Sequence, residues 1–129
     1  MINLHSPFIN KTAIKYLKKC VNSGWVSTGG KLVEDFEKKI CNFTGAKYSI
    51  ACNSGTSALH ISLKLADVRP GDEVLAPTLT FVATINAILY NSCRPIFMDC
   101  DEFFNIDAQK TLEFLKTNTY RKNKFTFNK

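Results

Sequence analysis

Apolar residues recur at helical spacing in two segments near the start of the chain. In residues 11–23 they fall on one face of a helix, and Gly24 follows where that helix would end. Residues 31–43 repeat the pattern, with Gly45 as the stop. Charged residues occupy the opposite face of both segments, so the pattern predicts two amphipathic helices.

Short apolar runs and helical patterns alternate in the residues that follow. The runs predict strands at 47–52, 73–77 and 94–101, and the helical patterns predict helices at about 56–66, 80–91 and 107–117. Asp107 is a suitable N-cap for the last of these helices. Repeated units of strand and helix predict an α/β fold with a mostly parallel sheet, flanked by helices and with ligands at the carboxyl ends of the strands.

The composition is that of a folded globular protein. The chain has 129 residues, of which 45% are hydrophobic and 22% charged, and this is enough for one domain with a buried core. No segment reaches the roughly 20 apolar residues of a membrane span. Residues 1–10 lack the basic start and apolar run of a signal peptide. We therefore expect a cytoplasmic protein with no membrane partner.

Cysteine spacing and charge exclude further classes. The five cysteines form no CxxC pair, which argues against a disulfide framework and a zinc ribbon, and we expect small buried side chains and no metal. The net charge of +6 arises largely in residues 118–129, which hold four basic residues and no acidic one. The rest of the chain holds 13 basic and 11 acidic residues, so we expect no nucleic-acid partner.

The segment NSGTSALH (53–60) lies where a predicted strand passes into a predicted helix. Its junction consists of small residues: Ser54, Gly55, Thr56 and Ser57. A helix start leaves backbone N–H groups without intrahelical partners, and these groups bind phosphate together with the positive end of the helix dipole. The segment matches neither GxxxxGK[ST] nor GxGxxG. From these residues alone, an anion site and a helix cap without a ligand both remain open.

Several segments together resemble one known family. They are SGWVSTGG (23–30), FE (36–37), NSGTSALH, PGDEVLAPTLTFVATINAI (70–88) and RPIFMDCDEFFNID (94–107). Their order and spacing resemble the first third of a DegT/DnrJ/EryC1/StrS sugar aminotransferase, over nearly every residue from Asn3 to about Thr117. The resemblance implies the N-terminal part of the large domain of a fold-type I pyridoxal-phosphate-dependent transferase, with an incomplete sheet.

The resemblance also implies roles for individual residues. Residues 54–57 match the turn that holds the phosphate of pyridoxal 5'-phosphate, and Phe81 matches the aromatic residue that lies against the pyridine ring. Trp25 matches a loop near the substrate, in a site that the family builds from two subunits. Phe81 has an alternative place in the core, and Trp25 an alternative role as the packing anchor of its loop. His60 is expected to be packed within its helix rather than catalytic.

The implied activity is the transfer of an amino group from an amino acid, with glutamate as the expected donor, to a nucleotide-linked keto-sugar. Such an enzyme would serve surface polysaccharide biosynthesis and act as a homodimer. The reaction needs a lysine that holds the cofactor as a Schiff base and an acid at the pyridine nitrogen. In the family both lie downstream of Asp107, beyond residue 129. We therefore expect an N-terminal fragment without catalytic residues of its own and inactive alone.

The expected layout has three parts. Residues 1–45 supply the N-terminal helices and the substrate loop, and residues 46–117 supply the units of strand and helix. Residues 118–129 are expected to be a polar tail, an interrupted connection to a missing part of the domain.

Two other functions remain open. Asp99 and Asp101 follow a predicted strand, which is where metal-dependent glycosyltransferases place a D-x-D motif that binds a divalent ion and a sugar-nucleotide diphosphate. No companion acid cluster appears, and the family pattern already accounts for both residues. Alternatively, the fragment is not catalytic and acts only in association with another chain. A requirement for manganese or magnesium would indicate the glycosyltransferase, and retention of pyridoxal phosphate would indicate the aminotransferase.

Overall fold

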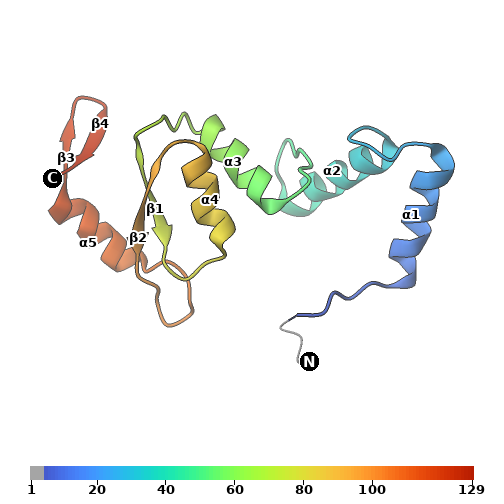
Figure 1. Cartoon of the computed structure of the whole chain (residues 1–129), viewed down its shortest axis with the longest axis horizontal. Helices are drawn as coiled ribbons and strands as arrows, with labels where there is room; N and C mark the ends of the chain where they lie inside the picture. The colour runs from blue at the N-terminus through green and yellow to red at the C-terminus, as the bar shows by residue number, and fades with distance from the viewer. Residues whose placement is uncertain (1–4) are drawn as a thin grey trace. The chain divides into compact units, whose positions relative to one another are not determined.

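The computed structural model describes residues 5–129 as two compact units, the first ending at Ala51 and the second beginning at Cys52. The elements, labelled in Figure 1, are α1 (Lys11–Ser23), α2 (Lys31–Thr44), α3 (Gly55–Leu65), β1 (Glu73–Pro77), α4 (Val82–Tyr90), β2 (Arg94–Met98), α5 (Ala108–Asn118), β3 (Thr119–Lys122) and β4 (Phe125–Asn128). All five predicted helices and two of the three predicted strands are confirmed, with boundaries that differ by at most three residues.

The first unit contains the two amphipathic helices. Asn10 caps α1, because its side chain accepts a hydrogen bond from the backbone nitrogen of Ala13 at 3.0 Å. Both helices end at glycines in the left-handed conformation, Gly24 with φ 72° and Gly45 with φ 73°. The glycine stops predicted from the sequence therefore set the lengths of α1 and α2.

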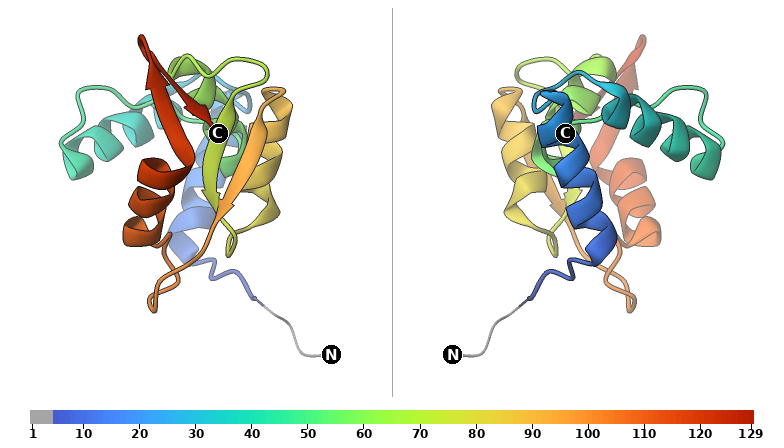
Figure 2. Two further views of the ribbon diagram at one scale, coloured as in Figure 1. Left: turned by 90° about the vertical axis from the view of Figure 1, so that its left-hand side faces the viewer. Right: turned by 90° about the vertical axis from the view of Figure 1, so that its right-hand side faces the viewer.

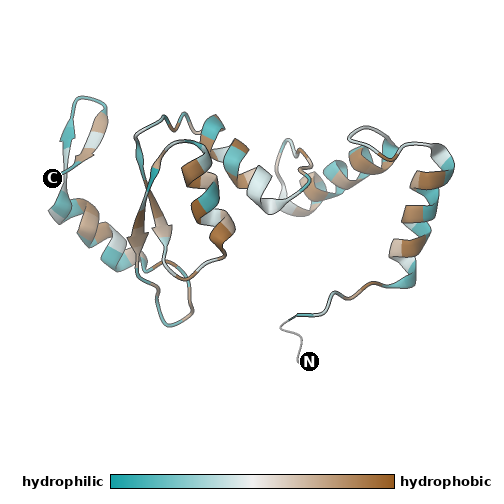
Figure 3. Ribbon diagram, viewed as in Figure 1, coloured by the Kyte–Doolittle hydropathy of each residue, from teal (hydrophilic) through white to brown (hydrophobic). Residues whose placement is uncertain are grey.

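The apolar faces of α1 and α2 have little cover within their own unit. Figure 3 shows apolar residues recurring along each helix, separated by polar ones. Neither helix has a buried residue among those described, and Leu17, Val21 and Phe43 are mostly exposed. Helices with such faces are stabilised mainly by packing against another surface.

The second unit is built around a parallel pair of strands. β1 pairs with β2 in the register Glu73↔Arg94 to Pro77↔Met98, with α4 as the connection between them. Figure 1 shows α4 and α5 on opposite sides of the two strands. Ala76, Ile88 and Cys93 form the buried centre of this unit. Half-buried Leu63, Val68, Val74 and Ile85 pack around them. This arrangement confirms the predicted parallel βαβ unit.

The predicted strand at 47–52 is wrong. These residues are irregular, and the backbone nitrogen of Ala51 donates to the Glu37 side chain at 2.8 Å instead of to a strand. A strand needs a neighbour to satisfy its backbone groups, and between residues 5 and 129 no strand pairs with this segment.

The end of the chain forms an antiparallel hairpin that the sequence analysis did not predict. β3 and β4 pair from Thr119↔Asn128 to Lys122↔Phe125, and the rings of Tyr120 and Phe127 stack with their centroids 5.6 Å apart. Asn123 takes the left-handed conformation in the turn, with φ 57°.

None of the helices in the described part of the chain has the length and hydrophobicity needed to cross a bilayer.

Candidate functional site

The side chain of Ser54 caps the N-terminus of α3. Ser54 is extended, with φ −157° and ψ 159°, and its Oγ accepts a hydrogen bond from the backbone nitrogen of Ser57 at 3.2 Å. The hydroxyls of these two serines lie 3.1 Å apart. The carbonyl of Ser54 accepts the first helical hydrogen bond, from Ala58 at 3.1 Å. Ser54 is therefore the N-cap of α3, which was one of the two roles that the sequence left open for this segment.

Two backbone donors at the same helix start remain available to a ligand. Within residues 5–129, the N–H groups of Gly55 and Thr56 have no acceptor, as expected in the first turn of a helix. A Cβ added at Gly55 would meet nothing within 4 Å, so the approach to these donors is open. Thr56 and Ser57 are half-buried and carry hydroxyls beside them. The arrangement fits the phosphate group of a cofactor.

Phe81 follows β1 and occupies the N-cap position of α4. Its backbone is extended, with φ −63° and ψ 144°, and its side chain is 88% exposed. The alternative place in the core is therefore wrong for the described structure. An aromatic ring that is held at the start of a helix and is open to solvent is available to stack on a flat ligand.

Helices α3 and α4 pack against each other through their polar as well as apolar residues. The Asn91 side chain donates to the carbonyl of Ala87 at 2.8 Å and to that of His60 at 3.3 Å. The His60 ring lies 6.0 Å from that of Tyr90, and its Nε2 is buried without a partner among the described residues. His60 is thus a packed side chain, as predicted. In Figure 1 both helices run the same general way, so their N-termini face the same end of the unit.

Trp25 belongs to the first unit, in the loop between α1 and α2. Its ring covers two glycines: a Cβ at Gly30 would lie 3.1 Å from Trp25 Cβ, and one at Gly29 would lie 3.4 Å from the indole ring. The side chain is nevertheless 60% exposed. It borders an open, mostly apolar cleft of about 570 Å³ between the end of α1 and the start of α2. Trp25 therefore anchors its loop and also presents a free ring surface.

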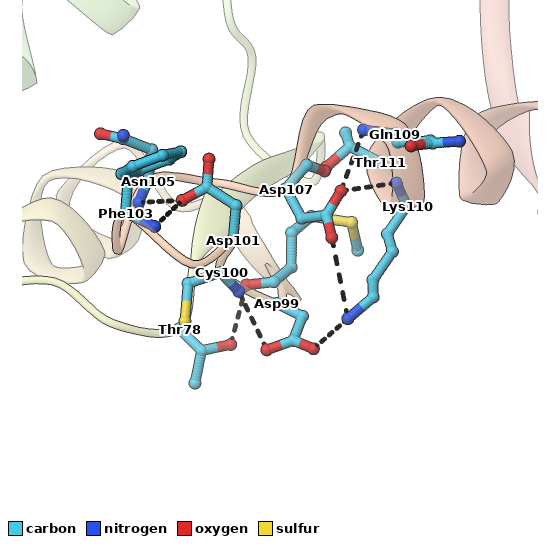
Figure 4. A network of polar contacts seen from close by, with 11 residues as sticks. Thr78, Asp99, Cys100, Asp101, Phe103, Asn105, Asp107, Gln109, Lys110 and Thr111 are labelled. Atoms are coloured by element: carbon cyan, nitrogen blue, oxygen red, sulfur yellow. Dashed lines mark hydrogen bonds and ion pairs between the residues drawn. The ribbon is translucent and has the colours of Figure 1, made fainter.

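The loop after β2 is organised by an ion pair that the sequence analysis did not single out. Lys110 Nζ lies 2.6 Å from Asp99 Oδ2 and 3.7 Å from Asp107 Oδ2 (Figure 4). Its hydrogen bond lowers the pKa of Asp99, and the same bond raises the pKa of Lys110. The sequence did contain a signal for this ion pair, because Lys110 lies three residues after the predicted N-cap Asp107.

The other carboxylate of the D-x-D segment is also used by the loop. Asp101 Oδ1 accepts hydrogen bonds from the backbone nitrogens of Phe103 and Asn105, both at 2.9 Å (Figure 4). Over the described residues there is no group of three or more side chains suited to hold a metal ion. Asp99 and Asp101 therefore act as structural groups here, and nothing in their geometry favours the metal-dependent glycosyltransferase.

The fold defines the class of protein. The structure of a putative sugar aminotransferase, Spr1654 from Streptococcus pneumoniae in its PLP form, matches with a TM-score of 0.76 and 27% identity, over 87% of this chain and 29% of that one. The same protein is also solved in a PMP form. The described fold is thus part of a pyridoxal-phosphate-dependent aminotransferase fold.

The family follows from the sequence match. The model of the DegT/DnrJ/EryC1/StrS aminotransferase family matches residues 7–123. The chain belongs to this family, which confirms the resemblance noted in the sequence. Pyridoxal phosphate, the cofactor expected from that resemblance, is the cofactor of the family.

Two curated relatives are sugar-biosynthesis proteins. A GDP-perosamine synthase of Caulobacter vibrioides is 38% identical over 90% of this chain and 31% of its own length. The spore coat polysaccharide biosynthesis protein SpsC of Bacillus subtilis is 44% identical over 81% of this chain and 27% of its own length. The chain therefore spans about three tenths of the length of the relatives it matches.

Proposed function

We propose that this chain is the cofactor-anchoring part of a sugar aminotransferase, which moves an amino group from glutamate to a nucleotide-linked keto-sugar for surface polysaccharide biosynthesis. The observation that carries the proposal is the start of α3, where the N–H groups of Gly55 and Thr56 have no acceptor among the described residues. By resemblance, residues 54–57 match the phosphate turn of the family. The similarity to a GDP-perosamine synthase and to a spore coat polysaccharide biosynthesis protein supports the substrate class.

The phosphate would be held by the first turn of α3. The free N–H groups of Gly55 and Thr56 and the hydroxyls of Thr56 and Ser57 are its donors, and the helix dipole adds favourable charge. Hydrogen bonds to a charged group contribute roughly 1.5 to 3 kcal/mol each. Ser54 contributes indirectly to phosphate binding, because its hydroxyl oxygen accepts a hydrogen bond from the backbone nitrogen of Ser57 and so stabilises the start of the helix.

Phe81 would orient the flat ring of the cofactor. When bound, pyridoxal phosphate supplies an electron sink that lets an amino group leave one substrate and join another. Phe81 lies in the loop that follows the carboxyl end of β1, on the side where ligands of parallel sheets bind, and its ring is exposed. The cofactor would then be held at two points, its phosphate at the start of α3 and its ring against Phe81, and these two contacts would fix its orientation.

Trp25 would contact the sugar. Its exposed indole and the apolar cleft beside it form a surface of the kind that a sugar ring packs on. In this proposal the site is shared between two subunits of a homodimer, and glutamate as the donor comes from the resemblance alone. The five free cysteines fit a reducing compartment, which supports the cytoplasm as the expected location.

Equilibrium dialysis tests the proposal directly. The chain is dialysed against pyridoxal phosphate, with pyridoxal, which lacks the phosphate, as the matched ligand. We expect retention of pyridoxal phosphate, competition by inorganic phosphate and weaker retention of pyridoxal. Equal retention of the two ligands would show that α3 contributes a helix cap and no phosphate site.

A further inference from the structure

Asn91 is the one buried polar residue among those that the structure describes. It is 7% exposed and lies directly after α4, at the C-cap position. Its backbone nitrogen donates to the carbonyl of Ile88 at 3.1 Å, so its main chain continues the hydrogen bonding of the helix end. A buried polar side chain costs stability unless it is hydrogen-bonded, so the partners of this amide are informative.

The side-chain amide of Asn91 joins two helices. Its Nδ2 carries two hydrogens and can donate twice. One acceptor is the carbonyl of Ala87, 2.8 Å away in α4 itself, and the other is the carbonyl of His60, 3.3 Å away in the middle of α3. Within residues 5–129, no other hydrogen bond joins α3 to α4 or to its C-cap. Asn91 therefore supplies the directional contact between these helices.

The rest of the contact between α3 and α4 is apolar. The two helices lie side by side (Figure 1 and Figure 2), and Leu63 of α3 and Ile85 of α4 both pack against the buried centre. Hydrophobic packing is favourable but non-directional, so by itself it allows one helix to shift along the other. In coiled coils a single buried asparagine fixes the register of packed helices. Asn91 is placed to do the same for α3 and α4.

The same two helices carry the proposed cofactor contacts at their starts. The free N–H groups of Gly55 and Thr56 lie in the first turn of α3, and Phe81 is the N-cap of α4. Both N-termini face the same end of the unit (Figure 1). Because each helix is continuous, a shift of α4 along α3 would move the Phe81 ring relative to the two donors. The register of the helices therefore sets the spacing of the two contact points.

We propose that Asn91 is a positioning residue for the cofactor site. Its hydrogen bond to the carbonyl of His60 fixes the spacing between the phosphate donors of α3 and the ring of Phe81. Asn91 itself does not touch the ligand, because it lies at the opposite end of α4 from Phe81. The inference rests on the proposed function, in which pyridoxal phosphate is held at two points. Such a ligand binds tightly only where the spacing of the two contacts matches it.

Ligands with one and with two contact points test this role. Pyridoxal phosphate should use both contacts, inorganic phosphate only the start of α3, and pyridoxal only Phe81. Asn91→Leu keeps the size of the side chain and removes its two donors. We expect this variant to bind pyridoxal phosphate about tenfold more weakly or worse, and to bind the other two ligands within about twofold of the parent. NMR titration of the 129-residue chain measures all three affinities.

Ile88→Val is the matched control. It removes one carbon from the buried centre, in the same helix, and leaves the amide of Asn91 in place. It should lower the melting temperature and leave the ratios of the three affinities as in the parent. An equal loss for all three ligands in Asn91→Leu would overturn the proposal, because Asn91 would then serve stability alone. Unchanged binding in Asn91→Leu, or a selective loss in Ile88→Val, would overturn it too.

A measurement on the parent chain stands even where Asn91→Leu fails to fold. Coupling between two equilibria is reciprocal, so bound pyridoxal phosphate should strengthen the contact between Asn91 and His60 in return. Exchange of the Asn91 side-chain amide hydrogens should slow by about tenfold with pyridoxal phosphate and stay unchanged with inorganic phosphate or pyridoxal. Unchanged exchange with pyridoxal phosphate bound would overturn the role of Asn91.

The parent chain also separates this inference from the proposed function. A parent that binds pyridoxal phosphate no better than pyridoxal overturns the proposed phosphate site, and the role of Asn91 with it. A parent that prefers pyridoxal phosphate, together with an Asn91→Leu variant that shows the same preference, overturns the role of Asn91 and leaves the phosphate site in place.

Discussion

The hydroxyl oxygen of Ser54 accepts a hydrogen bond from the backbone nitrogen of Ser57, 3.2 Å away. This contact uses one of the backbone N–H groups at the start of α3 and leaves two others free within the described structure. Ser57 is satisfied within the chain, whereas Gly55 and Thr56 keep free N–H groups within the described structure. The cap and the proposed phosphate site therefore use different donors. Ser54→Ala should cost about 1 kcal/mol of stability by loss of the cap.

Thr56→Val should weaken the binding of pyridoxal phosphate to the chain by about one to two orders of magnitude. Valine keeps the shape of the side chain but removes a hydroxyl whose hydrogen bond to a phosphate is worth roughly 1.5 to 3 kcal/mol. Equilibrium dialysis against pyridoxal phosphate measures the change. Ser62→Ala, on an exposed part of the same helix, is the control and should bind as the parent does. Parental affinity in Thr56→Val would leave the α3 start as a helix cap only.

Phe81→Ala should reduce cofactor retention by up to about tenfold, because stacking of an aromatic ring is worth roughly 0.5 to 1.5 kcal/mol beyond the area buried. The ring is 88% exposed, so the free energy of unfolding should hardly change. Phe103→Ala removes another exposed phenyl ring and serves as the control. Cofactor titration and a thermal melt on both variants separate binding from stability. Equal binding by the two variants would remove Phe81 from the site.

The sequence predicted those parts of the fold that depend on local signals. α1 and α2 end at Gly24 and Gly45 because both glycines adopt the left-handed conformation there. Asp107 caps α5, because its side chain accepts hydrogen bonds from the backbone nitrogens of Gln109 and Lys110. The strand expected at 47–52 failed because pairing depends on a neighbour that local sequence does not contain.

The roles of the candidate site residues stay a prediction, whereas the structure does show how Ser54 and Phe81 are placed. A helix cap in residues 53–57 was left open by the sequence, and the structure assigns it to Ser54, whose side-chain oxygen satisfies a free N–H. The sequence could not decide between core and pocket for Phe81, because residue type alone favours burial and the ring is exposed in the fold. The Tyr120–Phe127 hairpin did have a signal, alternation around Asn123, which the charges of the tail obscured.

Cysteine reactivity should follow the structure closely. Cys93 is 3% exposed, burial raises the pKa of its thiol, and its Sγ lies 3.1 Å from the carbonyl of Arg69. Cys52 is exposed. Iodoacetamide at neutral pH should label Cys52 first and Cys93 last, as followed by mass spectrometry of peptides. Denaturant should remove the difference, and labelling of Cys93 at the same rate in the native chain would contradict the buried centre of the second unit.

The ion pair of Asp99 and Lys110 should give the second unit a broad pH range of stability. The pKa of Asp99 is lowered, so its contribution is present above the unfolded value of about 3.9 and is lost as pH falls through the folded value. The pKa of Lys110 is raised, so its contribution is present below about 10.4 and is lost as pH rises through the folded value. The free energy of unfolding, measured in urea, should be lower for Lys110→Met than for the parent at neutral pH. The difference should disappear at pH values below the folded pKa of Asp99 and above the folded pKa of Lys110. A difference that persists at pH 2 would mean that the lysine stem, not its charge, stabilises the loop.

The isolated 129-residue chain should have no transaminase activity. None of its 14 lysines lies in a segment that matches the lysine motif of the family, and the transfer needs a lysine to hold the cofactor and move the proton. The chain is incubated with pyridoxal phosphate, glutamate and GDP- or UDP-linked keto-sugars, and formation of 2-oxoglutarate is followed. Free cofactor without protein is the control. Binding of pyridoxal phosphate at the start of α3 without turnover would separate anchoring from catalysis, whereas turnover above the control would place a catalytic lysine within residues 5–129.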